Sequence, residues 1–471
     1  MVFNSLTFFL FFAVVLGIHN TRLSWTVKKV NLIVASYIFY VAWNPAFVIL
    51  LWVSTLVDWT AAGQMAKHDN RWVKRFFLIV SLFVNLGLLG FFKYGNFLLD
   101  NIVSTLLIFD ITFQPMQPDI VLPVGISFYT FQSMSYTVDV YRGRMKPWDS
   151  ALDFSLYVTF FPQLVAGPIV RATAFLPQCI DARKASAEQM SYGLFLLLLG
   201  LFQKVVLADT LLAPIADTVF SNTGRIGTPD AWAGALAFTN QIFFDFAGYS
   251  TCAIGVAMCL GFTLPPNFKF PYGAVGFSDY WQRWHISLSS WLRDYLYIPL
   301  GGNRKGKVRT QVNLMLTMLI GGLWHGASWQ FVAWGGLHGF YLVLERGLKS
   351  GLGHLRIHRT WIGLLILSAL THLCVVLTYV FFRAQSFSDA FLLLGQMVSG
   401  TGIEMLTVQE YRTAIIMAVS VFGFHFFMRD RSLKTIVFKT PPVLLAGCVA
   451  VMLILLVLTP GDDRAFIYFQ F

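Results

Sequence analysis

Three stretches of this sequence contain no Asp, Glu, Lys or Arg over a length that suits a membrane crossing: residues 76–92, 361–382 and 443–459. A helix needs about 20 apolar residues to cross the hydrocarbon core of a bilayer. The apolar residues follow one another without the alternation of barrel strands, so these stretches predict helices. Only 12% of the 471 residues are charged, whereas about 25% is typical of soluble proteins. We therefore expect an all-α, polytopic integral membrane protein.

The placement of the 34 Lys and Arg residues predicts how the chain crosses the membrane. Hydropathy suggests about twelve crossings, with most basic residues in alternate loops and acidic residues in the others. Positively charged loops stay in the cytoplasm, so both termini are expected on the opposite side. We expect a single transmembrane domain, residues 1–471. The basic loops lie around residues 22–29, 67–75, 142–146, 171–184, 269–309, 346–359 and 429–439.

Two neighbouring basic loops do not fit a simple alternation of membrane sides. Residues 142–146 and 171–184 fall on the same predicted side, although residues 154–169 between them are apolar. A re-entrant hairpin that breaks at Pro162 or at Gly167-Pro168 would resolve this, provided that it is buried in protein. Topology also explains the net charge of +11, and the sequence has no nucleic-acid-binding motif, so we expect membrane lipid and no nucleic acid as a partner.

Residues 277–304 combine aromatic side chains with arginines. This composition is typical of the headgroup level of a membrane and predicts an interfacial helix. At helical spacing its apolar stripe would comprise Trp281, Trp284, Leu288, Trp291 and Leu292. Alternatively, the arginines of this stretch could receive an anionic substrate from the cytosol, such as the phosphates of a nucleotide carrier.

Residues 310–344 contain no Asp, Glu, Lys or Arg and are too long for one crossing, so we expect two arms separated by a glycine-rich break. At about 1.5 Å per residue, His325 lies roughly 22 Å from Thr310 and past the middle of the bilayer. A histidine at that depth usually faces the protein interior and is neutral, and a neutral imidazole can act as a general base. His325 is therefore the first candidate for catalysis and His338 the second. For His372 and His425 we expect packing or a helix–helix hydrogen bond.

Other polar groups leave more than one interpretation. Asp245 lies in a long apolar run and could orient a histidine or an arginine, or form a structural ion pair. The five cysteines have no metal-binding spacing, and we expect no metal. No nucleophile motif is present, so the hydroxyl that accepts a transferred group is expected to arrive on another molecule.

The segments 283–303 and 321–326 closely resemble the membrane-bound O-acyltransferase family, and within it the bacterial alginate O-acetyltransferase-like branch. They read Arg-Trp-His-Ile-Ser-Leu-Ser-Ser-Trp-Leu-Arg-Asp-Tyr-Leu-Tyr-Ile-Pro-Leu-Gly-Gly-Asn and Gly-Gly-Leu-Trp-His-Gly. Further blocks fit the same branch, so the resemblance covers essentially the whole chain: residues 91–97, 122–128, 161–168 and 468–471. One departure is Asp245-Phe-Ala-Gly-Tyr-Ser-Thr251, which lacks the first serine and the last carboxylate of the usual pattern.

The resemblance implies a ring of about 11–12 transmembrane helices with re-entrant and interfacial helices, and a catalytic region at about residues 277–345. His325 matches the catalytic histidine, and His285 matches the second motif histidine. Acetyl-CoA is the implied acyl donor, and it is expected to enter from the cytosol beside His285. The residues expected to bind it are Arg283, Trp284, Arg293, Asn303 and Arg304.

The implied location is the inner membrane of a bacterium, with both termini in the periplasm. The implied partner is a periplasmic or membrane-anchored acetyltransferase of the SGNH-hydrolase-like type, which passes the acetyl group to a polysaccharide. Alginate is the first choice for that polymer, with cellulose and peptidoglycan as alternatives. Two other functions stay open from the sequence: a membrane transporter, and a non-catalytic scaffold of a polysaccharide synthesis or export complex.

Overall fold

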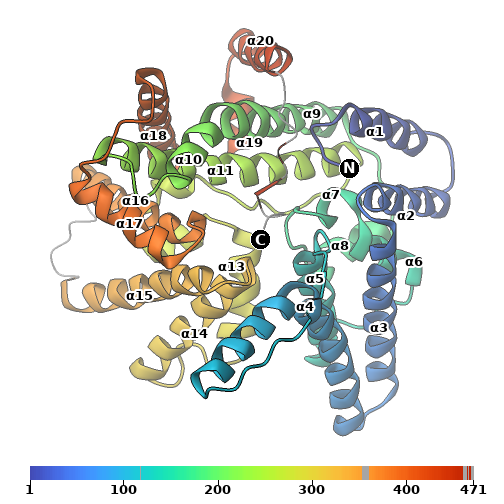
Figure 1. Ribbon diagram of the computed structural model, residues 1–471. Helices are drawn as coiled ribbons and strands as arrows, with labels where there is room; N and C mark the ends of the chain where they lie inside the picture. The colour runs from blue at the N-terminus through green and yellow to red at the C-terminus, as the bar shows by residue number, and fades with distance from the viewer. Residues whose placement is uncertain (117, 353–359, 460–463, 465, 468–471) are drawn as a thin grey trace. The chain divides into compact units, whose positions relative to one another are not determined.

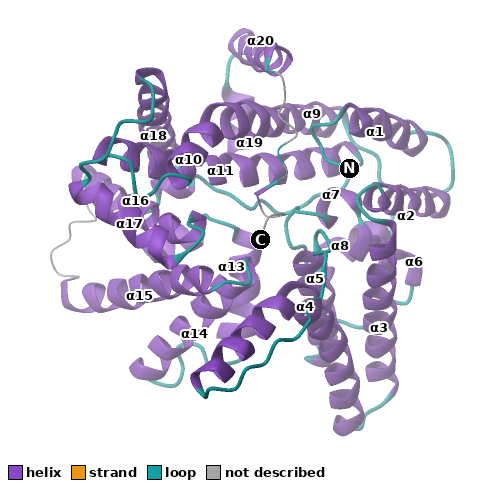
Figure 2. Cartoon of the chain, in the orientation of Figure 1, coloured by secondary structure: helices purple, strands orange, loops and turns teal. Residues whose placement is uncertain are grey.

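The computed structural model describes residues 1–116, 118–352, 360–459, 464, 466 and 467. These residues fold into helices and connecting loops (Figure 2), and the only extended pairings among them are two isolated bridges, Ile226 with Ile403 and Gly227 with Thr401. The expected all-α fold is confirmed. The terminal block 468–471 lies outside the described residues, as do Arg356 and Arg359 of the basic loop at residues 346–359.

The helices group into two compact units, the first comprising Met1–Leu197 and Cys252–Pro265. Serine and asparagine side chains cap several of its helices, because their oxygens accept the free N–H groups of the first turn. Ser5, Ser24 and Asn70 do so for α1, α2 and α4. The helices of this unit are α1 (Leu6–His19), α2 (Trp25–Val41), η1 (Pro45–Phe47), α3 (Val48–Lys67), α4 (Arg71–Ile108), α5 (Ile126–Tyr141), α6 (Ala151–Thr159), α7 (Phe161–Leu164), α8 (Ala172–Phe175), η2 (Leu176–Cys179) and most of α9 (Ala187–Leu201).

The second unit comprises Leu198–Thr251 and Pro266–Phe471 and contains His285, His325 and His338. Its elements are η3 (Phe202–Leu212), α10 (Ala213–Phe220), most of α11 (Thr228–Cys259), η4 (Pro271–Gly273), α12 (Phe277–Trp281), α13 (Ile286–Leu292), η5 (Arg293–Tyr297), α14 (Lys307–His325), α15 (Trp329–Leu352), α16 (Trp361–Arg383), α17 (Phe387–Ser399), α18 (Val408–Met428), α19 (Leu433–Lys439) and α20 (Pro442–Leu458).

Six helical segments of the described chain are long and apolar enough to cross a membrane, and a seventh arises if the bent pair α19–α20 counts as one span. The six are Pro45–Lys67, Arg71–Ile108, Ala187–Phe220, Thr228–Cys259, Trp361–Arg383 and Val408–Met428. The protein is therefore a multi-pass membrane protein, as its composition predicts. The count of about twelve crossings and the sides of the loops and termini stay predictions.

The apolar segment 154–169 is broken and buried, as a re-entrant hairpin requires. α6 ends at Thr159, and Phe160 adopts a non-helical ψ of 108° before the short helix α7 begins. The break therefore falls just before Pro162, one of the two expected positions. Residues 156–170 are buried within the first unit, so neighbouring protein covers the irregular backbone.

The aromatic stretch 277–304 does not form the single helix that its spacing predicts. α12 ends at Trp281, and His285 has a φ of +42°, which is incompatible with a continuing right-handed helix. α13 starts directly after His285. Trp284 and Leu288 of the expected stripe are fully enclosed by protein. The aromatic side chains therefore build the interior of the second unit around His285.

The segment 310–344 forms two arms as predicted, since α14 and α15 pack side by side (Figure 1). The break lies at residues 326–328, directly after His325. The other glycines serve a different purpose. A Cβ on Gly322 would lie 2.2 Å from the Phe331 carbonyl oxygen, and one on Gly335 would lie 2.2 Å from the Met318 carbonyl oxygen. These glycines allow the two backbones to touch.

Candidate functional site

His325 is the last residue of α14, and its side chain is enclosed by aromatic rings. Only 2% of the residue is exposed. Its ring centroid lies 4.9 Å from that of Trp334, 5.1 Å from that of Trp324 and 5.5 Å from that of Phe382, all edge to face. Trp334 comes from α15 and Phe382 from α16. The α14–α15 contact and the apolar helix α16 therefore fix the position of this imidazole.

His285 faces the same aromatic cluster from the α12–α13 break. The centroids of the His285 and His325 rings are 6.3 Å apart, and that of Trp324 is 5.7 Å from His285. A hydrogen bond of the next residue stabilises the left-handed backbone conformation at His285: the Ile286 N–H donates to the Asn267 carbonyl oxygen at 2.9 Å. His285 lies outside the candidate membrane spans, and burial lowers its pKa to about 3. Its imidazole is therefore neutral at physiological pH.

His338 lies on α15 four residues after Trp334, and their rings are in contact. The Thr378 hydroxyl donates to the Val375 carbonyl oxygen at 2.8 Å, so at 3.1 Å it must accept from His338 Nε2–H. His338 thus carries its proton on Nε2. Its ring lies 4.7 Å from that of Trp334, which separates it from His325. His338 can support the Trp334 wall but does not contact the His325 ring through any described interaction.

The five residues predicted to bind the acyl donor fall into two groups. Arg283 and Trp284 are buried. Arg283 Nε donates to Asp279 at 2.8 Å, and one of its terminal nitrogens donates to the Arg429 carbonyl oxygen at 2.5 Å. The other three residues are exposed, and the structure therefore does not bring all five together: Arg293 begins η5, and Asn303 and Arg304 lie between η5 and α14.

Asp245 forms a structural ion pair, which is one of the two alternatives that the sequence leaves open. Lys204 Nζ donates to Asp245 and also, at 2.9 Å, to Asp209. All three residues are buried. Lys204 and Asp209 lie on η3, a π-helical segment, and π-helices are frequent at functional sites. The sequence-based prediction does not include Lys204, although it is the single lysine of the apolar segment 187–220, which is a signal of a functional or structural role.

Ile467, near the C-terminus, is hydrogen-bonded to this ion pair. Ile467 N–H donates to the second carboxylate oxygen of Asp245 at 3.0 Å. The preceding Phe466 is 1% exposed, and its ring lies 5.7 Å from that of Phe246, which in turn lies 4.6 Å from that of His285. The described tail residues therefore lie one aromatic ring away from His285.

Comparison with known proteins shows the family to which the chain belongs. A sequence profile of the MBOAT, membrane-bound O-acyltransferase family, matches residues 141–377, which include His285, His325 and His338. The probable alginate O-acetylase AlgI of Pseudomonas putida is 41% identical over 410 residues, which cover 85% of this chain and 80% of the relative. The chain belongs to the membrane-bound O-acyltransferase family.

The names of two further relatives refer to polymers other than alginate. The peptidoglycan O-acetyltransferase of Helicobacter pylori is 37% identical over 403 residues, 80% of this chain and 75% of the relative. The teichoic acid D-alanyltransferase of Bacillus subtilis is 27% identical over 240 residues, 48% of this chain and 60% of the relative.

Membership confirms the resemblance seen in the sequence and makes the protein an acyltransferase. The roles of His325, His285 and the five donor-binding residues stay predictions. Within the described residues, no group of three or more His, Cys, Asp or Glu side chains could hold a metal ion.

Proposed function

We propose that this O-acyltransferase moves an acetyl group from cytosolic acetyl-CoA across the bacterial inner membrane to a periplasmic acceptor. The observation that carries the proposal is the position of His325, a buried imidazole at a helix end, walled by Trp324, Trp334 and Phe382. Such a wall excludes water, which would otherwise hydrolyse the acyl donor.

In the proposed step, His325 accepts the proton of the acceptor hydroxyl, and the hydroxyl oxygen attacks the thioester carbonyl carbon. The new C–O bond forms as the C–S bond breaks, and the leaving thiolate takes up the proton that His325 received. The hydroxyl must lie within about 3 Å of the free imidazole nitrogen. In a variant of this step His325 is a transient acyl carrier: its nitrogen attacks the thioester carbonyl carbon, the C–S bond breaks and the thiolate leaves with a proton from the imidazole. The acceptor hydroxyl then attacks the acyl-imidazole, the C–N bond breaks, and the hydroxyl proton returns to the imidazole.

Neutral His285 suits a role beside the thioester, because it adds no charge to the aromatic surroundings of His325. Arg293, Asn303 and Arg304 are exposed and available to the phosphates of the donor. Arg283 and Trp284 are held inside the protein and would act by positioning His285, which follows them directly. The acceptor hydroxyl is proposed to belong to an SGNH-hydrolase-like partner that finally acetylates an exopolysaccharide, with alginate as first choice and cellulose or peptidoglycan as alternatives.

The test uses the His325→Ala variant of the full chain in inverted vesicles, whose outer face corresponds to the cytoplasmic side. Acetyl-CoA is added outside these vesicles. We expect transfer to fall to the uncatalysed rate while membrane insertion stays intact. His372→Ala is the matched control, since it removes another imidazole from an apolar helix without touching the site. Transfer by His325→Ala at the rate of the control would refute the catalytic assignment.

The polymer and partner require a cellular test. The gene would be expressed in strains that lack either an alginate O-acetylase or a peptidoglycan O-acetyltransferase, and the acetyl content of each polymer would be measured. We expect restored acetylation of alginate only. Restoration of peptidoglycan acetylation alone would redirect the polymer assignment, and restoration of neither would overturn both.

A further inference from the structure

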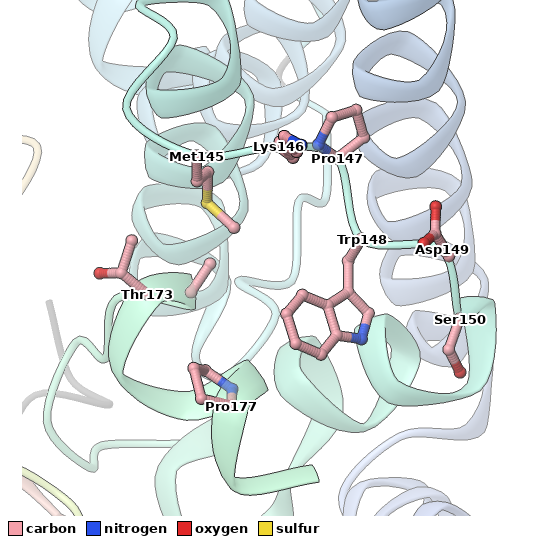
Figure 3. Close-up of a pocket in the computed structure, with 9 residues that line it drawn as sticks. Met145, Lys146, Pro147, Trp148, Asp149, Ser150, Thr173 and Pro177 are labelled. Carbon is pink, nitrogen blue, oxygen red and sulfur yellow. The ribbon is translucent and has the colours of Figure 1, made fainter. Parts of the chain in front are cut away.

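Two adjoining hollows lie in the first unit where α3 and α5 end and α4 begins. Their volumes are about 440 and 530 Å³, and they share Met145, Lys146 and Pro147. Figure 3 shows the Trp148 indole and the Met145 side chain pointing into the larger hollow, above Pro177. Neither hollow belongs to the histidine site of the second unit.

The loop that separates the hollows is held rigidly. α5 ends in a Schellman turn, in which Gly143 has a φ of +68° and Arg144 N–H donates to the Asp139 carbonyl oxygen at 2.9 Å. Trp148 is then fixed from two directions. Its indole N–H donates to Asp153 at 3.2 Å, and its carbonyl oxygen accepts the Trp59 indole N–H at 3.1 Å. A basic loop that only set membrane topology would not need such fixation.

The smaller hollow is strongly basic. Lys74, Arg144 and Lys146 line it, and none of its described lining residues is acidic. Tyr141 also lines it, and the nearby guanidinium groups of Arg75 and Arg71 lower the pKa of its hydroxyl. Asp139 lies 3.6 Å from Arg144 and offsets part of this positive charge. An excess of positive charge around a preformed hollow favours a phosphate.

The surroundings favour a lipid as the source of that phosphate. α3 and α4 are candidate membrane spans, so the hollow lies at the end of membrane-crossing helices. Trp72, two residues before Lys74 on α4, is exposed, with the Arg75 guanidinium 5.2 Å from its ring centroid, an arrangement typical of the headgroup level. The larger hollow adds an apolar floor of Met145, Pro147 and Trp148 for the glycerol and upper acyl region.

We propose that the smaller hollow binds the phosphate of an anionic phospholipid headgroup, with Lys74, Arg144 and Lys146 as its ligands. The predicted cytoplasmic side of this loop places the lipid in the inner leaflet. The bound headgroup would neutralise charges that the rigid loop holds close together.

The test uses the full chain in detergent, titrated with phosphatidylglycerol and followed by native mass spectrometry. Each basic group near a headgroup contributes about fivefold in affinity, so Lys74→Gln/Lys146→Gln should weaken the tightest bound copy at least tenfold. The matched control, Lys305→Gln/Lys307→Gln, removes equal charge from another exposed basic loop and should change nothing. The single variant Lys146→Gln, at an exposed position that lines both hollows, gives a second measurement if the double variant unfolds.

Three outcomes would overturn the proposal. Equal losses in both double variants would mean that only net charge matters. Equal binding of phosphatidylcholine would mean that the anionic headgroup is not recognised. Displacement of the lipid by coenzyme A or inorganic phosphate would mean that the hollow binds a soluble phosphate ligand instead.

Discussion

The contact between α14 and α15 leaves no room for a methyl group at Gly335, and we expect Gly335→Ala to impair catalysis strongly. The added Cβ would lie 2.2 Å from the Met318 carbonyl oxygen, whereas ordinary contacts begin at 3.4 Å. The two helices must therefore separate by about 1.2 Å. The neighbouring Trp334 forms the wall of His325, and a shift of about 1 Å near a reacting group can cost about 100-fold in rate.

The rate would be measured as acetyl transfer from acetyl-CoA by the full chain in vesicles, together with thermal unfolding. Overpacking of this kind costs about 1–3 kcal/mol of stability, so the protein should still fold. Gly347→Ala is the control on the same helix, because a Cβ there meets nothing within 4 Å. If Gly335→Ala transfers acetyl groups within threefold of Gly347→Ala, the contact does not set the geometry of the site.

Three further predictions concern the buried charges and His285. Lys204→Met should lower the free energy of unfolding by about 3–5 kcal/mol, because it leaves the Asp245 carboxylate buried without its cation. Arg283→Lys should lower the melting temperature with little change in the KM for acetyl-CoA, because an ammonium group cannot reproduce the planar set of bonds to Asp279 and the neighbouring backbone. The pKa of His285 near 3 lies below the unfolded value of 6.5, so the unfolded chain binds more protons between these values and stability should fall as pH drops below about 6.5.

Each of these predictions has its own check. Lys434→Met removes a lysine from an exposed surface and should leave chemical unfolding almost unchanged. A higher KM for Arg283→Lys at an unchanged melting temperature would instead support direct donor binding by this arginine. His285→Phe should flatten the pH dependence of the melting temperature between pH 4 and 6.5, and an unaltered dependence would contradict the assigned protonation state.

The sequence predicts most strongly where local rules decide. Charge-free apolar runs predict helices because lipid leaves the backbone no other partner, and the break after His325 follows from an excess of length over one crossing. The resemblance of residues 283–303 and 321–326 to a known family correctly indicates an acyltransferase. These conclusions depend on residues that are close together in the chain.

The features that the sequence does not predict arise from distant contacts. Lys204 and Asp245 are 41 residues apart, and nothing in either segment indicates the other as partner. The positive φ of His285 interrupts the helical stripe. The N–H groups of Ile286 and Ser287 at the start of α13 donate to Asn267, a contact that periodicity cannot reveal. Gly322 and Gly335 look like flexible breaks in the sequence, but their role is the close approach of two straight helices.

The end of α14 has an electrostatic consequence for the proposed chemistry. The peptide dipoles of a helix sum to a partial negative charge at its C-terminus, where a cation is stabilised by about 0.3–1 kcal/mol and by up to about 2 kcal/mol in a partly buried site. His325 is the last residue of that helix. When His325 takes a proton during acyl transfer, the imidazolium forms at the C-terminus of α14, where the partial negative charge stabilises it. The backbone therefore supplies a counter-charge in a site where the neighbours of this histidine are mainly aromatic.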